Sequence, residues 1–477
     1  MDMLRPIFAV VNGCIDITTG KVRSSGATPA VHSPPLAASP QGGPVHKRSL
    51  AALACIAAVT AVVAACGSSG SAPAASADAS KQQTLTVWYM TGDLSSATIA
   101  AIDRAFTDET GAKVNVQIQQ WQDINTKITT ALTQSSPPDV LELGNTDVPL
   151  FAANGGLADL TSDARALEQG QSWLPGLAGP ATVSGHVFAA PLFGGNRAVI
   201  YNKKIWAAAG VSTAPASYAE LLTDLNKIKA ANAGKPGFSA FYFPGKYWYS
   251  ALQWVWDAGG QLASETDGKW QGDLAAPAAQ QGLQAWKTFQ NTYSTPASRN
   301  TDTTTPDFNV LFAQGKTSAI LNTSVNTILA DNPGMKDEIG TFPMPGASAG
   351  ATQPVFLGGS DIAIAAKSTH QALALKYLEV ASSPAVQSAD VVGIDHWTPI
   401  STQLITSTAG LLSATSRAFA TAAQHSVATP ATPGWATIES DSSINSFFAD
   451  IATGRQTTMT AATAFDAHLD QALNSSP

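Results

Sequence analysis

The chain has 477 residues, of which 44% are hydrophobic and only 13% are charged, and its net charge is −8. This length provides for two or three domains or for two large lobes with ample apolar cores. The acidic balance argues against a nucleic-acid-binding protein, because that function favours a basic face. All eleven tryptophans lie at residue 88 or beyond, so the beginning of the chain differs in kind from the rest.

The first 65 residues resemble no folded segment. Residues 1–44 are rich in serine, proline and glycine, whereas His46-Lys47-Arg48 is followed by an apolar run from Leu50 to Ala65. A basic patch before a short apolar run is typical of a secretory signal peptide, and the run is shorter than the roughly 20 residues that span a bilayer. We predict a signal peptide over 45–65, with translation starting at Val45 and 1–44 not translated. An uncleaved membrane anchor is the alternative.

The end of the apolar run, Val63-Ala64-Ala65-Cys66, resembles the lipobox of bacterial lipoproteins. The resemblance implies cleavage before Cys66 and acylation of its thiol, with the protein held at the outer face of the cytoplasmic membrane. Residues 66–82 are rich in alanine, serine and glycine and predict a flexible tether. Because Cys14 and Cys55 lie upstream of the cleavage point, the mature chain keeps no thiol for a disulfide, a zinc site or a nucleophile.

Residues 84–143 alternate strand and helix patterns. They predict strands at 84–89, 114–118 and 139–143 and helices from about Ser95 to Gly111 and over 124–132. This order is typical of an open parallel sheet flanked by helices. Ligands of such sheets bind beyond the carboxyl ends of the strands. The residues predicted at that rim are Trp88 to Asp93, Gln120-Trp121 and Asn145-Thr146-Asp147, of which Trp88, Trp121, Asn145 and Asp147 are candidate ligand residues.

The segment 185–203 consists of two extended runs separated by Gly194-Gly195. Two glycines between strands can absorb large dihedral changes, so we interpret the segment as a hinge crossing between two lobes. An ordinary strand-turn-strand within one domain is the alternative. Asn196 and Arg197 follow the glycines and are candidates for the cleft that such a crossing borders.

Several segments, in order, resemble motifs of family 1 extracellular solute-binding proteins, the sugar-capturing components of ABC importers. They are Gly155–Thr161, Val187–Pro191, Val199–Lys203, Pro215–Leu221, Phe312–Ile320, Gly358–Ala365, Trp397–Ile400, Pro433–Trp435 and Gly454-Arg455. The resemblance covers nearly all of 84–475. It implies an α/β fold of the periplasmic-binding-protein type, with two lobes joined by hinge crossings, each a mostly parallel sheet flanked by helices.

The lobe boundaries expected from this resemblance divide the chain at the two crossings. We expect lobe 1 to hold 84–192 and 308–355, and lobe 2 to hold 196–305 and 359–477. The second crossing would contain Gly358-Gly359, with backbone N–H groups near the cleft.

Sugar binding needs a flat aromatic surface for the C–H face and fixed hydrogen-bonding groups for the hydroxyl rim. Tyr247 and Trp248 stand just after Pro244-Gly245, at a predicted helix start where side chains can face a cleft. Core packing is the alternative for aromatic candidates, and a solvated turn or an inter-lobe salt bridge is the alternative for polar ones. The candidate ligand residues are Trp88, Trp121, Asn145, Asp147, Asn196, Arg197, Tyr247, Trp248, Gly359, Ser360, Asp361, His396 and Trp397.

Catalytic and metal patterns are weak. The histidines are scattered without metal-ligand spacing, and Gly315-Lys316-Thr317 is no phosphate loop, because Val310 stands where the first glycine is required. No Gly-x-Ser-x-Gly elbow occurs, but the two carboxylates of a glycosidase cannot be recognised by pattern. We predict a monomeric binding protein, not an enzyme, without cofactor or metal, that delivers a sugar to a membrane permease. A secreted carbohydrate-active enzyme, a non-transport surface lipoprotein and a different small polar ligand stay open.

Overall fold

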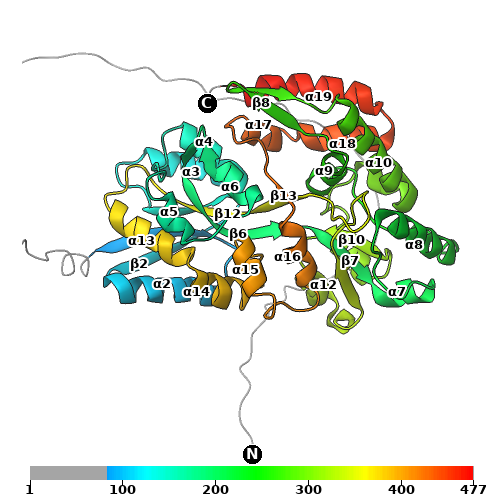
Figure 1. Ribbon diagram of the computed structural model, residues 1–477, viewed down its shortest axis with the longest axis horizontal. Coiled ribbons are helices and arrows are strands. Elements are labelled where there is room, and N and C mark those ends of the chain that lie inside the picture. The colour runs from blue at the N-terminus through cyan, green and yellow to red at the C-terminus, as the bar shows by residue number, and fades with distance from the viewer. Residues whose placement is uncertain (1–82, 476–477) are drawn as a thin grey trace, which may run out of the picture. The chain divides into compact units, whose positions relative to one another are not determined.

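The computed structural model describes residues 83–475, and its first lobe is built on a mixed sheet (Figure 1). β1 (Thr84–Met90) lies between β2 (Lys113–Gln119) and β3 (Val140–Gly144), and both neighbours run parallel to it. Beyond β3 the sheet continues antiparallel with β12 (Val355–Ile364). The strand-helix-strand order predicted from the sequence is therefore confirmed, and the three parallel strands end at one edge of the sheet.

The helices between these strands begin and end where local chemistry sets them. Ser95 caps α2 (Ser96–Thr110) by accepting a hydrogen bond from Thr98 N, and Gly111 ends it with a left-handed φ of 75°. α3 (Ile124–Thr133) covers the sheet with Ile124, Ile128 and Leu132 buried. Both helices thus bury one apolar stripe against the strands.

The two lobes are joined by a pair of long antiparallel strands, β6 (Ala189–Asn196) and β12. Gly194 lies opposite Gly359 and Gly195 lies opposite Gly358, so the two glycine pairs predicted as crossings contact each other. β6 runs through its glycines without a break, and β7 (Ala198–Asn202) follows directly. The absence of side chains at these glycines therefore lets β6 and β12 approach each other closely, in addition to the flexibility predicted from the sequence.

Gly359 shows why this approach requires glycine. Its φ is 133°, a conformation that side chains rarely adopt. A Cβ built on Gly359 would lie 2.2 Å from the carbonyl oxygen of Phe193. No side chain fits at this point of the crossing.

The second lobe has a three-stranded sheet in which β7 is central. β10 (Ala319–Asn322) and β11 (Ile339–Phe342) pair with its two edges, both antiparallel. This differs from the mostly parallel sheet expected for each lobe. Helices supply most of the surrounding core, which contains the fully buried Trp206, Trp286 and Trp435. The larger of these helices are α8 (Tyr218–Ala231), α9 (Trp248–Asp257), α10 (Pro277–Tyr293), α18 (Ser443–Thr453) and α19 (Thr458–Leu473).

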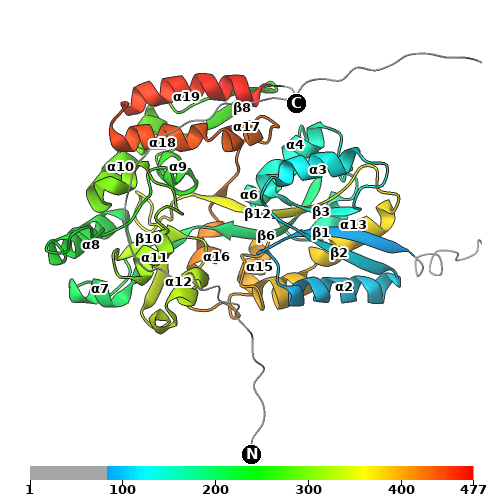
Figure 2. The ribbon, with the colours of Figure 1, turned by 180° about the vertical axis from the view of Figure 1, so that it is seen from behind.

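The packing contradicts part of the expected lobe boundaries. Residues 308–344 pack into the core of the second lobe, not the first, because β10 and β11 complete the sheet around β7. Residues 360–412 pack mainly with the first lobe, because β12 pairs with β3 and α13 (Gln371–Ala381) packs beside α2 (Figure 2). Residues from 196–305 and from the C-terminal helices share the hydrophobic core around β7.

Short elements complete both lobes. In the first lobe and around the crossing they are η1 (Asn145–Asp147), α4 (Val148–Ala153), α5 (Ala164–Glu168), α6 (Pro175–Ala181), β4 (Thr182–Val183), β5 (His186–Val187), α14 (Pro384–Val386), η4 (Gln387–Val392), α15 (Thr402–Ser407), α16 (Arg417–Ala423) and β13 (Ser426–Val427). In the second lobe they are α7 (Lys203–Ala208), β8 (Ala263–Thr266), β9 (Lys269–Gly272), η2 (Pro296–Asn300), α11 (Phe308–Ala313), α12 (Asn326–Asp331), η3 (Pro333–Met335) and α17 (Trp435–Ser440).

Within residues 83–475, no helix combines the length and apolarity needed to cross a bilayer. The predictions for 1–44, for the signal peptide at 45–65, for Cys66 and for the tether up to residue 82 lie outside the described residues.

Candidate ligand-binding cleft

A cavity of about 600 Å³ lies between the two lobes, with the crossing strands as its floor. The first lobe lines it with residues that follow β1, β2 and β3, as the strand-end rule predicts. These are Asp93, Trp121, Asn125, Thr146 and Asp147. The second lobe contributes Tyr249 from α9 and Ala436, Glu439 and Ser440 from α17.

Seven of the thirteen predicted ligand residues line this cavity: Trp121, Asn145, Asp147, Arg197, Gly359, Ser360 and Trp397. Asn196 and His396 line a neighbouring cavity, which Trp397 shares. Trp88, Tyr247, Trp248 and Asp361 line neither.

Trp88 and Trp248 belong to the hydrophobic cores. Trp88 is 8% exposed, and its Nε1 donates a hydrogen bond to Gln117 Oε1 (2.9 Å). Trp248 is 2% exposed, and its ring packs edge-on against that of Trp435 with centroids 5.6 Å apart. The expectation that these two rings face the cleft is wrong, because both helix and strand turn them inward.

Asp361 is also turned inward. It is fully buried on β12, and within residues 83–475 neither carboxyl oxygen has a hydrogen-bond partner. Burial raises the pKa of this carboxyl well above its usual range. The side chain of Asp361 is therefore enclosed in the protein interior and does not line the cavity.

The amides of the two predicted asparagines hold the framework together. Asn145 Nδ2 donates to the carbonyl oxygens of Gly176 (3.1 Å) and Leu357 (3.0 Å), which ties α6 to β12. Asn196 Nδ2 donates to the carbonyl oxygen of Phe419 (2.9 Å). Both residues thus position the cleft; both amide N–H groups of Asn145 are used, and Asn196 also accepts a hydrogen bond from Thr398 Oγ1 at its Oδ1 (3.2 Å).

Arg197 is held by three aromatic rings at the cavity wall. Its guanidinium carbon lies 4.6 Å from the ring centroid of Tyr249, 5.5 Å from that of Phe356 and 5.9 Å from that of Tyr247. Its Nε donates a hydrogen bond to Tyr247 Oη (3.2 Å). Tyr247 therefore orients Arg197 from behind. Nη1 of Arg197 is buried and has no partner within the described residues.

Aromatic rings line the cavity from both lobes. Trp121 is 37% exposed and is one of the few large apolar side chains left open to solvent. Tyr249 and Phe356 lie opposite on the second-lobe side and pack against each other with centroids 5.2 Å apart. Trp397 is stacked on Phe193 with centroids 4.9 Å apart. Such faces attract the C–H edges of a ligand.

Two carboxyls from different lobes share the cavity. Burial raises the pKa of Asp147 to about 6, although Asn125 Nδ2 donates to its Oδ1 (2.8 Å) and acts in the opposite direction. Burial and the nearby charge of Asp147 raise the pKa of Glu439 to about 8. Thr146 Oγ1 donates to Glu439 Oε2 (2.9 Å), a hydrogen bond that joins the lobes. Of these two carboxyls, Glu439 therefore holds its proton to a higher pH than Asp147.

A second carboxyl pair lies deeper on the first-lobe side. Glu142 on β3 is fully buried and accepts a hydrogen bond from Met90 N (2.8 Å). Burial raises the pKa of Glu142 well above its usual range, and the charge of Asp93 raises it further. Burial likewise raises the pKa of Asp93. Burial thus favours the protonated form of both carboxyls, and the Met90–Glu142 hydrogen bond connects the end of β1 to β3.

The sequence did not identify Tyr249, Phe356 or Glu439 as site residues. Tyr249 directly follows the predicted pair Tyr247-Trp248. The aromatic-rich segment does contribute a ring to the cavity, but that ring is Tyr249 rather than Tyr247 or Trp248. Phe356 precedes the second glycine pair by two positions. For Glu439 no local pattern exists, because its place depends on how α17 packs onto the second lobe.

Two lobes joined by crossing strands, with a polar and aromatic cavity between them, define a class of binding proteins that close around a ligand by hinge motion. The model of the bacterial extracellular solute-binding proteins matches residues 91–388. The diacetylchitobiose binding protein DasA of Streptomyces coelicolor is 37% identical over 369 residues, which cover 77% of this chain and 84% of that protein. The chain belongs to the bacterial extracellular solute-binding protein family. This family consists of binding proteins rather than enzymes and implies that the chain is exported.

Solved structures show the same fold. The sugar-binding protein MalE of Xanthomonas citri superposes with a TM-score of 0.70 at 23% identity, covering 82% of this chain and 97% of that chain. The GacH receptor of Streptomyces glaucescens gives a TM-score of 0.67 at 24% identity, covering 83% and 99%. The two-lobed architecture predicted from the sequence is confirmed.

Proposed function

We propose that this protein binds a sugar in the cavity between its lobes and presents it to the membrane permease of an ABC importer. The support is threefold: membership of the solute-binding family, the similarity to a diacetylchitobiose binding protein, and the lining of the cavity. The single observation that carries the proposal is the combination of rings and paired carboxyls, from both lobes, around one cavity.

This lining matches the two faces of a sugar. Trp121 from the first lobe and Tyr249 from the second offer flat apolar surfaces for the C–H face. Asp147 accepts hydrogen bonds from hydroxyls, Glu439 donates one in the protonated form that its raised pKa favours, and Arg197 donates through Nη1, which has no partner within residues 83–475. A hydrogen bond to a charged group contributes about 1.5–3 kcal/mol, so a ligand lacking a matching hydroxyl would leave these groups unpaired and bind weakly.

The proposed ligand-binding residues are divided between the two lobes, which explains why a bound sugar would favour lobe closure. Asp147 and Trp121 move with the first lobe, whereas Glu439 and Tyr249 move with the second. A sugar that bonds to both sets stabilises the closed arrangement over the open one, because only closure brings both sets within reach. The Thr146–Glu439 hydrogen bond marks the place where the lobes meet.

We further propose that the exported chain is a monomer held at the outer face of the cytoplasmic membrane by acylation of Cys66. Cys66→Ser should release the protein from the membrane fraction into the soluble fraction. Continued membrane association of the variant would point to an uncleaved anchor. One acyl chain binds membranes only weakly, so we expect more than one.

The test is thermal and calorimetric titration of the purified protein with mono- and oligosaccharides, beginning with diacetylchitobiose and maltose. A ligand at 100 times its dissociation constant should raise the free energy of unfolding by about 2.7 kcal/mol. A structural surface lipoprotein would show no such rise with any sugar. Release of shorter sugars during incubation would contradict the proposal and favour a carbohydrate-active enzyme.

A further inference from the structure

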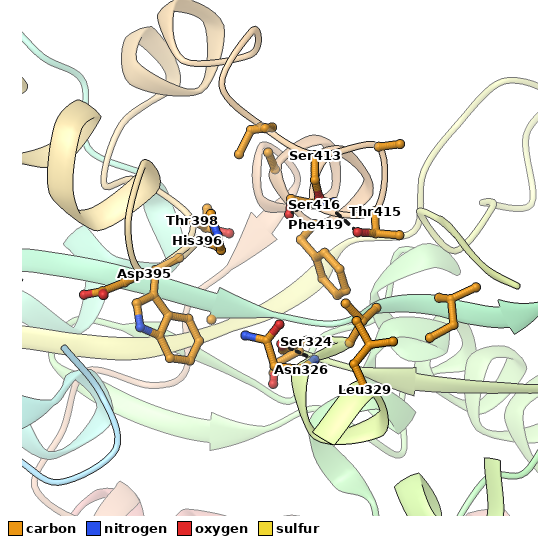
Figure 3. Close-up of a pocket in the computed structure, with 18 of the residues that line it drawn as sticks. Ser324, Asn326, Leu329, Asp395, His396, Thr398, Ser413, Thr415, Ser416 and Phe419 are labelled. Atoms are coloured by element: carbon orange, nitrogen blue, oxygen red, sulfur yellow. Dashed lines mark hydrogen bonds between the residues drawn. The ribbon is translucent and has the colours of Figure 1, made fainter. Parts of the chain in front are cut away.

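A second cavity of about 480 Å³ opens beside the first one (Figure 3). It lies between the segment 395–398, the loop that leads into α16 and the start of α12. Labelled side chains on its walls include Ser324, Asn326, Asp395 and Ser413 (Figure 3). None of the proposed sugar-binding residues Trp121, Asp147, Arg197, Tyr249 and Glu439 lines this second cavity.

The two cavities adjoin. Gly195, Thr323 and Trp397 line both of them. Gly195 has no side chain to obstruct the junction, and a Cβ built there would meet only the ring of Trp397 at 3.6 Å. The junction of the two cavities is therefore bordered by the backbone of β6 at Gly195, by the ring of Trp397 and by Thr323.

Trp397 is a rigid wall at this junction. Its ring stacks on Phe193 at an interplanar angle of 27°, and its Nε1 donates to the carbonyl oxygen of Asp93 (3.2 Å). The two contacts fix both the plane and the rotation of the indole. A fixed indole face between two polar cavities suits a chain of sugar rings, because each ring has an apolar face and a polar rim.

The far wall of the second cavity is rich in hydroxyl groups. Ser413 Oγ lies 3.0 Å from Thr415 Oγ1 and 2.7 Å from Ser416 Oγ, and the ring of Phe419 extends from this group toward Leu329 (Figure 3). Hydroxyls donate or accept as their rotors require, so this wall can pair with either role of a sugar hydroxyl. Asp337 and Asp395 add acceptors at the rim.

We propose that the two cavities form one groove and that the second cavity binds further units of a linear oligosaccharide, past Trp397. The proposal rests on the proposed sugar-binding function and specifies the length of the ligand as greater than two units. Each cavity alone falls in the range of about 300–1,000 Å³ that encloses a whole small ligand. A disaccharide in the first cavity therefore leaves the second one free for at least one more ring.

The experiment is calorimetric titration of the purified protein with a disaccharide and the corresponding tetrasaccharide. Two series are used, β-1,4-linked N-acetylglucosamine and α-1,4-linked glucose, and the series whose disaccharide binds more tightly is analysed. Wild type should bind the tetrasaccharide at least tenfold more tightly than the disaccharide. Equal affinities for the two lengths would overturn the proposal.

Three alanine-to-tryptophan variants locate the effect. Ala414 is exposed and lines only the second cavity, so Ala414→Trp should remove the extra affinity for the tetrasaccharide and leave that of the disaccharide. Ala436 lines only the first cavity, so Ala436→Trp should weaken both ligands. Ala230→Trp, on the exposed face of α8, is the control and should change neither. Thermal unfolding checks that each variant is folded.

The outcomes separate the two proposals. Full tetrasaccharide affinity in Ala414→Trp would show that the second cavity is not used and would overturn the inference alone. Absence of any sugar binding by wild type would overturn the proposed function and the inference together.

Discussion

The two lobes supply the cleft in different ways. The first lobe places Trp121, Thr146 and Asp147 directly after consecutive parallel strands, so their proximity follows from sheet topology. The second lobe places Tyr249 and Glu439 on helices that pack in a core assembled from distant segments. The part of the site that lies at strand ends can be predicted from the order of strands and helices in the sequence. The part that lies on packed helices depends on tertiary structure.

The same contrast applies to aromatic residues. Trp121 stays 37% exposed because it follows an edge strand, whereas Trp248 is 2% exposed within helix packing. Substitution of Trp248 should therefore lower the stability of the protein, whereas substitution of Trp121 should lower its affinity for sugar.

Trp248→Ala should lower the free energy of unfolding by about 3–5 kcal/mol, because it empties a space next to Trp435 and Phe356 in the second-lobe core. Denaturant unfolding measures the loss. Trp248→Phe, which keeps most of the volume, should lose less than half as much. Weaker sugar binding with unchanged stability would instead return Trp248 to the cleft.

Gly359→Ala should lower the free energy of unfolding by about 2–4 kcal/mol, because the added methyl group clashes with the carbonyl of Phe193 at a positive φ. Gly195→Ala is the matched control on the partner strand, where the methyl group meets only ordinary contacts. We expect the control to remain within about 0.5 kcal/mol of wild type. Equal losses would contradict the account of the crossing.

Trp121→Ala should weaken sugar binding by about 1–1.4 kcal/mol, roughly fivefold to tenfold, by removing one aromatic face. Stability should change little, because the ring is partly exposed. Calorimetry measures the affinity, and Trp121→Phe should retain part of it. An unchanged affinity would remove Trp121 from the site.

Glu439→Gln should reduce the dependence of stability on pH. The pKa of Glu439 is raised from 4.5 to about 8 in the folded protein, so between these values the folded protein holds a proton that the unfolded chain has released. The free energy of unfolding therefore falls as the pH rises through this window. The variant should show a shallower fall between pH 5 and 8 in denaturant titrations. Glu265→Gln, at an exposed position, should keep the wild-type slope.

Much of the first lobe could be predicted from the sequence. The strands at 84–90 and 140–144, the helix start near Ser95 and the stop at Gly111 all follow from local patterns that the structure confirms. The glycine pairs also indicated the crossing. Their mutual pairing could not be foreseen, because strand register between residues more than 150 positions apart leaves no local trace.

The second lobe was predicted less well for a physical reason. Residues 308–344 were expected in the first lobe, yet β10 and β11 complete a sheet around β7. Antiparallel partners of this kind can come from any part of the chain. Likewise, periodicity showed that Trp248 lies on a helical face, but it did not show which face is buried.

The central claim is that the lobes move together around a bound sugar. It is tested most directly by measuring the distance between labels on Gln122→Cys in the first lobe and Ser440→Cys in the second, both exposed positions beside the cleft. Cys14, Cys55 and Cys66 are replaced by serine. A saturating sugar should shift the distance distribution to a shorter and narrower one. The same distribution with and without bound sugar would contradict the account.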